Sequence, residues 1–272
     1  ALPILLVYKR YVQRGDIRVM AKVYDNRLNM LDSSRFTFDY KSRKDFLSES
    51  VIDNEGNVYF TAQHRSSNNK TYTTLGLFIC RKNAEVKQVE IPLQDKRLLQ
   101  STLAFDNNHK RCIITADYSQ NSKYRSDGVF IAYIDALSQE LLQQHFVAFS
   151  DSVKTLLKPS GGNAYDEEDY HPDFVLVKKN GAVVIVKEDA YEEIISAYNP
   201  WNNSMINNPG VFTPADYYYS PYQSSFYNRN YGRSRTRYYN NNINIIQIDS
   251  SLQNQWLRVI AKNQYAEDED SY

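Results

Sequence analysis

The feature that most constrains this chain is a repeated hairpin block, in which an apolar strand is followed by a short polar turn and a second apolar strand. The block occurs four times, at 17–38, 76–91, 128–149 and 242–262. A second hairpin block alternates with it, at 50–62, 103–118 and 174–189. Strict alternation of two hairpin types is typical of a repeat protein, in which each repeat buries its apolar faces against its neighbours.

Within the blocks, apolar and other residues alternate with the period of two that is typical of β-strands, so that Val58 and Phe60 share one face. Asn, Asp and Gly fill the turns at 53–57, 106–109 and 178–181, where tight hairpins need positive φ angles. Two consecutive hairpins give a four-stranded antiparallel sheet of ~40–50 residues, the size of a propeller blade. The sequence therefore predicts an all-β fold, a β-propeller of four-stranded antiparallel blades.

Placed in register, the blocks predict about four blades in one domain that spans residues 1–272. The blades are expected at 2–38, 46–91, 98–149 and 172–262, the first of them without its first strand. Because four blades are few for a closed ring, we expect the chain to be the first part of a larger propeller. A twisted sandwich or a solenoid is the all-β alternative, and helix is expected only as a turn near 151–157.

Within each blade, the link between the two hairpins varies in length. These links are 63–74, 119–127 and a large Tyr/Asn-rich loop insertion at 190–241. Because the links are topologically equivalent, they are expected to emerge on one face of the disc, where a propeller would bind its partner.

The insertion has an unusual composition, with nine Tyr, ten Asn, four Pro and four Arg between Ala197 and Asn242. It has too few aliphatic residues to build a core of its own. It is interpreted as a loop packed over its own propeller, as a protein-binding surface rich in hot-spot residue types, or as a glycan-stacking surface. The candidate binding residues are Tyr198, Trp201, Tyr217, Tyr218, Tyr219, Tyr222, Tyr227, Arg229, Tyr231, Arg233, Arg235, Arg237, Tyr238 and Tyr239.

No catalytic motif assembles in the sequence, because the four His are scattered and no metal-binding or nucleophile pattern is present. The acidic run at 166–169 could bind a divalent cation, but it lacks calcium-loop spacing and is expected to be a solvated turn. We therefore predict no catalytic residue, no metal and no cofactor. A glycosidase pair of carboxylates from distant blades stays open as an alternative.

The charges balance, with 32 basic and 32 acidic residues, which gives no electrostatic reason to expect nucleic acid or an anionic membrane as a partner. No run approaches the ~20 apolar residues of a membrane-spanning helix. Cys80 and Cys112 each lie beside an Ile in a predicted strand, so we expect two buried free thiols, with a bridge between neighbouring blades as the alternative.

Three features in order carry a resemblance to a known group. They are the DNEGN hairpin at 53–57, the Tyr/Asn/Ser-rich insertion at 217–242, and NIIQIDS at 244–250 followed by Trp256. This order resembles uncharacterised Bacteroidota cell-envelope proteins, and the resemblance implies a multi-bladed propeller exported to the periplasm or cell surface. Asp151-Ser152-Val153 resembles an O-glycosylation acceptor of that phylum, which makes Ser152 a predicted modification site. Both chain ends are expected to be processing or cloning boundaries.

Together these observations predict a non-enzymatic binding or scaffold propeller of a bacterial cell envelope. A protein partner is expected on the face that carries the loops at 63–74, 119–127 and 190–241. The alternative is a glycan-binding or glycan-cleaving propeller that acts at the same face.

Overall fold

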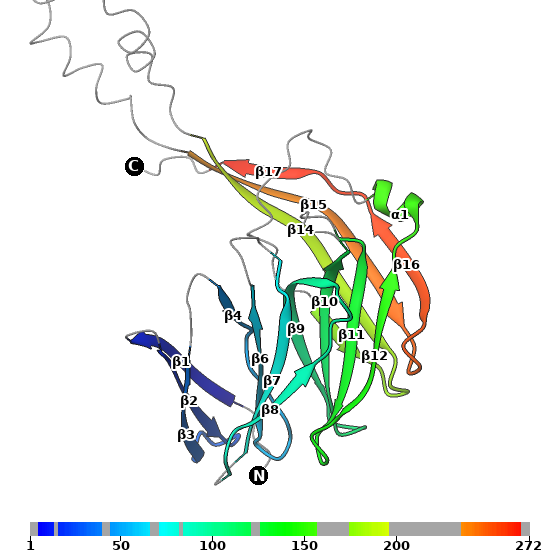
Figure 1. Ribbon diagram of the computed structural model, residues 1–272. Helices are drawn as coiled ribbons and strands as arrows, with labels where there is room; N and C mark the ends of the chain where they lie inside the picture. The colour runs from blue at the N-terminus through cyan, green and yellow to red at the C-terminus, as the bar shows by residue number, and fades with distance from the viewer. Residues whose placement is uncertain are drawn as a thin grey trace, which may run out of the picture.

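The computed structural model shows an all-β fold with one short helix, as predicted (Figure 1). Four antiparallel sheets, A to D, follow one another along the chain. The helix α1 (Asp151–Leu156) lies where a helical turn was expected. The residues that the structure describes are 5–13, 16–39, 44–65, 71–81, 84–120, 126–156, 174–195 and 235–267.

Sheets A and B contain the first two predicted repeats. Sheet A consists of β1 (Leu5–Gln13), β2 (Asp16–Tyr24) and β3 (Met30–Asp39). Sheet B has the order β4-β6-β7-β8, with β5 also paired to β6. Its strands are β4 (Asp45–Leu47), β5 (Val51–Ile52), β6 (Val58–His64), β7 (Thr74–Cys80) and β8 (Lys87–Ile91).

Sheets C and D contain the other two repeats. Sheet C consists of β9 (Arg97–Asp106), β10 (Arg111–Ser119), β11 (Gly128–Asp135) and β12 (Leu141–Ala148). Sheet D consists of β13 (Phe174–Val177), β14 (Val183–Ile195), β15 (Arg235–Ile248) and β16 (Asn254–Ile260), with β17 (Gln264–Glu267) also paired to β15. The repeat boundaries predicted from the hairpin blocks are thus reproduced, including a first sheet of three strands.

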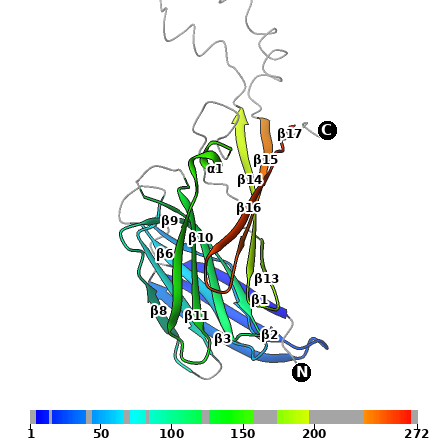
Figure 2. The same ribbon diagram turned by 90° about the vertical axis from the view of Figure 1, so that its right-hand side faces the viewer.

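The four sheets stand side by side as an open series, and the described residues form no closed ring (Figure 1). Figure 2 shows β14 and β15 projecting beyond the other strands at one end of the molecule. At the opposite end lie the short turns within each hairpin. The prediction of a series of antiparallel sheets is therefore confirmed, with three, five, four and five strands in sheets A to D, but a complete propeller is absent from the described part of the chain.

The central strands of sheet C, β10 and β11, are buried on both faces because the sheet lies between sheets B and D. Cys112 and Ile114 of β10 belong to the apolar cluster shared with sheet B, whereas Ile113 belongs to the cluster shared with sheet D. In β11, Phe130 and Ile131 divide in the same way. The two-residue period of a strand therefore joins sheet C to a neighbour on each side.

Aspartates organise the turns at the other end of the sheets. Both side-chain oxygens of the buried Asp53 accept hydrogen bonds, Oδ1 from the backbone of Glu55 and Asn57 at 2.9 Å and Oδ2 from Tyr59 at 2.8 Å. The turn at Asp135 is built similarly, and hydrogen bonds from the Ser138 backbone lower the pKa of the Asp135 carboxyl. These contacts satisfy backbone N–H groups that the turn would otherwise leave unpaired.

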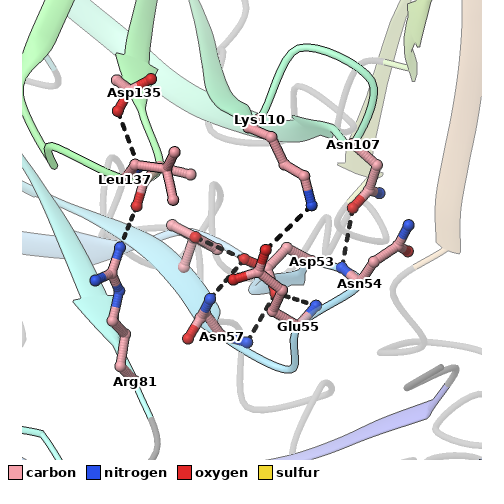
Figure 3. Close-up of polar contacts among 11 residues, drawn as sticks. Asp53, Asn54, Glu55, Asn57, Arg81, Asn107, Lys110, Asp135 and Leu137 are labelled. Carbon is pink, nitrogen blue, oxygen red and sulfur yellow. Dashed lines mark hydrogen bonds and ion pairs between the residues drawn. The ribbon is translucent and has the colours of Figure 1, made fainter. Parts of the chain in front are cut away.

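Neighbouring turns are also joined to each other (Figure 3). The backbone N–H of Asn54 donates to Asn107 Oδ1 at 2.9 Å, and Lys110 Nζ lies 3.1 Å from Glu55 Oε1. Because one residue of each pair comes from sheet B and the other from sheet C, the turns help to hold the two sheets together.

We predict that Asp53→Ala lowers the free energy of unfolding by about 1.5–3 kcal/mol, the range for loss of hydrogen bonds to a charged group. The change removes the acceptor of the fully buried Tyr59 hydroxyl as well as the acceptor of the turn backbone. Urea denaturation measures the change, with Asp135→Ala at a more exposed turn as the matched control. An equal loss in both variants would contradict the special role of Asp53.

Both cysteines are buried free thiols, as expected, in the cluster shared by sheets B and C. Burial raises the pKa of Cys80 to about 12 and raises that of Cys112 as well. No disulfide therefore joins sheets B and C through Cys80 and Cys112.

We expect neither thiol to react with Ellman's reagent at pH 8 in the native protein, because the reactive thiolate is suppressed and access is blocked. In guanidinium chloride, two thiols per chain should react without prior reduction. Rapid reaction of either cysteine in the native protein would show that the cluster is open to solvent.

Candidate functional site

Most of each link that was predicted to share one face lies outside the described residues, whereas the strands that flank the links are described. Residues 65–73 link β6 to β7, 120–127 link β10 to β11, and 196–234 link β14 to β15. Each link joins the second and third strands of its sheet, so the strand ends that flank the three links lie at the same end of the sheets. The predicted bounds of the long insertion were too wide, because β14 continues to Ile195 and β15 begins at Arg235, with pairs such as Tyr191↔Tyr239 between them.

Four of the predicted binding residues are described, and all four lie in β15 rather than in a loop. Arg237 forms an ion pair with Glu267 of β17, and the rings of Tyr239 and Tyr265 lie 6.1 Å apart. Tyr238 is 37% exposed. Arg235 is the fourth. The other ten lie outside the described residues: Tyr198, Trp201, Tyr217, Tyr218, Tyr219, Tyr222, Tyr227, Arg229, Tyr231 and Arg233. Strand pairing with β17 was not foreseen from the sequence.

A different site emerges where the first strands of sheets B, C and D converge. Contacts of β9 with β5, β6 and β13 bring these sheets together there. A pocket of about 290 Å³ lies between them. We call it the Lys187 pocket, and the residues that matter here are Phe46, Ser50, Ser101, Asp117, Phe174 and Lys187.

The Lys187 pocket contains a buried ion pair between sheets D and C. Lys187 Nζ lies 2.6 Å from Asp117 Oδ1, and the two side chains are only 5% and 6% exposed. Removing two such charges from water costs several kcal/mol per ion, and their attraction often does no more than offset that cost. The pair therefore adds little net stability for the desolvation free energy that it requires, so a purely structural role explains it poorly.

This pair is not among the residues predicted from the sequence, although the sequence contains a signal for it. Lys187 ends the run VVIV in β14, and Asp117 lies between Ala116 and Tyr118 in a strand that is buried throughout. A charged residue within a strand that has two buried faces needs a partner. The two residues are 70 positions apart, so the sequence did not indicate that they pair.

The wall of the pocket that sheets B and C provide is held by hydrogen bonds. Gln63 accepts from the Ser101 backbone N–H at 2.9 Å and donates to the Leu99 carbonyl at 2.8 Å. The Ser101 and Thr61 hydroxyls lie 2.6 Å apart. By contrast, the buried Ser50 Oγ has no hydrogen-bond partner among the described residues. A buried hydroxyl in that state costs free energy unless a further molecule binds to it.

A second candidate lies in a wider groove of about 930 Å³ that sheet B lines together with Thr37 of β3. Asp45 contacts His64 Nδ1 there, an arrangement that fixes the tautomer of an imidazole. The His64 side chain is 40% exposed, so water screens this pair far more than the buried one. Within the described ranges, no group of three or more His, Cys, Asp or Glu side chains is arranged to hold a metal ion.

No protein-family model and no curated protein matches the chain. Among solved structures, a Synechocystis apocarotenoid oxygenase matches at 8% identity and a TM-score of 0.40, over 96% of this chain and 60% of the oxygenase. A chimera of that oxygenase with RPE65 matches at 10% identity and a TM-score of 0.39, over 94% of this chain and 58% of the chimera. This chain thus spans about 60% of the oxygenase's length.

The prediction of a non-enzymatic scaffold is wrong by this comparison, because the solved structures that the chain resembles are those of an oxygenase, an enzyme. That interpretation is given up, and none of the comparisons supports its alternative, a glycan-binding or glycan-cleaving propeller. At this identity and TM-score, no activity, substrate or residue role comes to this chain from the likeness. Separately, no helix among the described residues is long and apolar enough to cross a membrane.

Proposed function

We propose that the Lys187 pocket binds a small neutral molecule that carries a hydroxyl or amide group, and that Lys187 and Asp117 perform acid–base chemistry on it. The observation that carries the proposal is a buried ion pair in the wall of a cavity. Convergent polar groups in a pocket near the lower end of the ~300–1,000 Å³ range are typical of a small-molecule site.

The charge balance of the pocket favours a neutral ligand. The Lys187 ammonium and the Asp117 carboxylate already compensate each other at 2.6 Å. An anionic ligand would be repelled by the carboxylate, and a cationic ligand by the ammonium, in a site with little water to screen either. A hydroxyl or a primary amide can accept from the ammonium and donate to the carboxylate at the same time.

The same pair supplies both partners for proton transfer. The ammonium can donate a proton to a leaving or developing anion, while the carboxylate can accept one from a bound hydroxyl. The Ser50 hydroxyl adds a further group that can bind the ligand. Opposed roles for two neighbouring titratable groups are a recurrent basis for acid–base assignments in enzymes.

We also infer that the four sheets are blades of a β-propeller. Support comes from the antiparallel path of four strands in sheets B, C and D, the face-to-face packing of the sheets in series, and the convergence of the first strands of sheets B, C and D. In a propeller, strands in that position line the central channel, which would place the Lys187 pocket on the axis.

Several expectations stay predictions. They are the Bacteroidota resemblance, export to the periplasm or cell surface, O-glycosylation at Ser152, and a protein partner at the Tyr/Asn-rich insertion. Ser152 is exposed in the first turn of α1, where its hydroxyl lies 2.9 Å from that of Ser150, so a modifying enzyme could reach it.

We predict that Lys187→Met lowers the free energy of unfolding by about 3–5 kcal/mol, because it leaves the Asp117 charge buried and unpaired. The double variant Lys187→Met/Asp117→Leu should recover this loss and match or exceed the wild-type stability. Urea denaturation of the three proteins measures the changes. A double variant less stable than the single one would assign the pair a structural role and remove the main support for the proposal.

Ligand binding provides the direct test of the proposed function. Small neutral diols and primary amides, with acetate and ethylammonium as charged counterparts, should be screened by saturation-transfer NMR. We expect neutral compounds to bind the wild type and the turn variant Lys179→Met, and to lose binding in the Lys187→Met/Asp117→Leu protein. Equal binding by all three proteins, or selection of a charged counterpart, would overturn the proposal.

A further inference from the structure

The wider groove on sheet B, which we call the His64 groove, contains a row of three polar side chains. His64 on β6 lies directly opposite Asp45 on β4 and directly opposite Thr74 on β7. Residues opposite each other in a sheet point to the same face, with Cβ atoms about 4.5–5.5 Å apart. All three residues line the groove. Three neighbouring strands therefore present a carboxylate, an imidazole and a hydroxyl to one cavity.

Asp45 sets the hydrogen-bonding roles of the two ring nitrogens of His64. An ionised carboxylate can only accept, so Nδ1, which Asp45 contacts, carries the proton, and Nε2 of the neutral ring keeps a lone pair. The His64 backbone is also held, because its carbonyl accepts from the Thr73 N–H at 2.8 Å and from the Thr73 hydroxyl at 3.2 Å. The side chain is 40% exposed, so water reaches this oriented base.

Beside the row, the groove has room for a substrate. The next residues on the same face of β6 and β7 are the small Ala62 and Gly76, and after them the rings of Phe60 and Phe78 stack with centroids 5.2 Å apart. A Cβ at Gly76 would lie only 3.2 Å from the amide nitrogen of Gln88, a donor that can bind a carbonyl oxygen. The groove volume of about 930 Å³ lies within the ~300–1,000 Å³ range of small-molecule sites.

The charges of the groove favour a substrate with a positive charge. Among the described residues that line it, Asp45 and Glu90 are acidic and none is Lys or Arg. A proton taken up by His64 compensates Asp45, which leaves the exposed Glu90. Glu90 lies opposite Gly76, one strand across and two residues along from Thr74, which corresponds to a Cα separation of about 8 Å. A cation a few bonds from the reacting atom would therefore reach the Glu90 carboxylate.

We propose that the His64 groove hydrolyses carboxylic esters whose acyl chain carries a cationic group. A water molecule held by His64 Nε2 and the Thr74 hydroxyl gives a proton to Nε2 while its oxygen bonds to the ester carbonyl carbon. The carbonyl oxygen takes up the negative charge, which the Gln88 amide stabilises. When the bond from the carbonyl carbon to the alcohol oxygen breaks, the proton passes from His64 to that oxygen. The products are a carboxylic acid and an alcohol.

In this reaction Asp45 is a positioning residue, because it acts only through the imidazole that it orients. His64, Thr74 and Gln88 contact the reacting atoms. The site lies on the opposite face of sheet B from Gln63, whose side chain bonds to sheet C in the wall of the Lys187 pocket. The proposal is therefore independent of the function proposed for that pocket.

Hydrolysis of three p-nitrophenyl esters tests the proposal. Their acyl groups are butanoyl chains that end in a trimethylammonium, a tert-butyl or a sulfonate group, and the absorbance of released p-nitrophenol measures the rate. We expect kcat/KM to be several-fold higher for the cationic ester than for its neutral isostere and lowest for the anionic ester. Glu90→Gln should remove that preference. No hydrolysis above the buffer rate, or equal rates for the three esters, would overturn the proposal.

His64→Gln should lower kcat/KM for the cationic ester about 100-fold, which lies within the range for loss of a general base. His109→Gln is the matched control and should keep the wild-type rate. His109 also contacts an aspartate through Nδ1, at 2.8 Å from Asp106, and its side chain is 42% exposed, but it lies in a turn and does not line the groove. An equal loss in both variants would assign the hydrolysis to surface imidazoles and overturn the proposal.

The remaining members of the row are tested by separating kcat from KM. Asp45→Asn should lower kcat at unchanged KM, and a change in KM alone would contradict its positioning role. Thr74→Val should lower kcat about tenfold through loss of one hydrogen bond, whereas Thr74→Ser should keep the wild-type rate. Urea midpoints should be unchanged in these variants, and activity losses that merely follow unfolding would overturn the assignment. Lys187→Met/Asp117→Leu should hydrolyse the cationic ester like the wild type, so this result is separate from the ligand test.

Discussion

Burial of both faces of the central strands of sheet C, β10 and β11, is the constraint on which the rest of the structure depends. Since adjacent residues of β10 point to opposite sides, Ile114 packs toward sheet B while Ile113 packs toward sheet D. A shift of one residue in the strand register would exchange these two faces along the whole strand. The position of sheet C therefore determines where its neighbours lie, and the Lys187 pocket is a consequence of that arrangement, because its walls come from three sheets.

The repeat and the turns were predictable because both depend on local physics. An aspartate that accepts hydrogen bonds from the next few backbone N–H groups is encoded within five residues, as at Asp53, and a period of two indicates a strand wherever it occurs. The ends of the long insertion were misplaced for a related reason. Polar composition suggested a loop at 235–241, yet Tyr favours strands, and here pairing with both β14 and β17 extends β15.

The candidate site was not predictable in the same way, because it depends on contacts between distant parts of the chain. Lys187 and Asp117 stand out locally as charges in apolar strands, but only the packing of sheet D on sheet C brings them to 2.6 Å. The Tyr and Arg residues of the insertion were predicted as the binding site instead, because an aromatic and Arg-rich composition can be recognised in the sequence without knowledge of the fold. Two Arg and two Tyr of the predicted binding residues lie on β15, where Arg237 and Tyr239 contact side chains of β17.

The charged pair within the C–D interface is a departure from a simple stacked-sheet design. It costs desolvation energy at a place where aliphatic side chains would serve packing equally well. Adding more of the fold cannot relieve this cost, because Lys187 and Asp117 already lie buried between the two sheets. For that reason we assign Lys187 and Asp117 to the proposed chemistry rather than to stability.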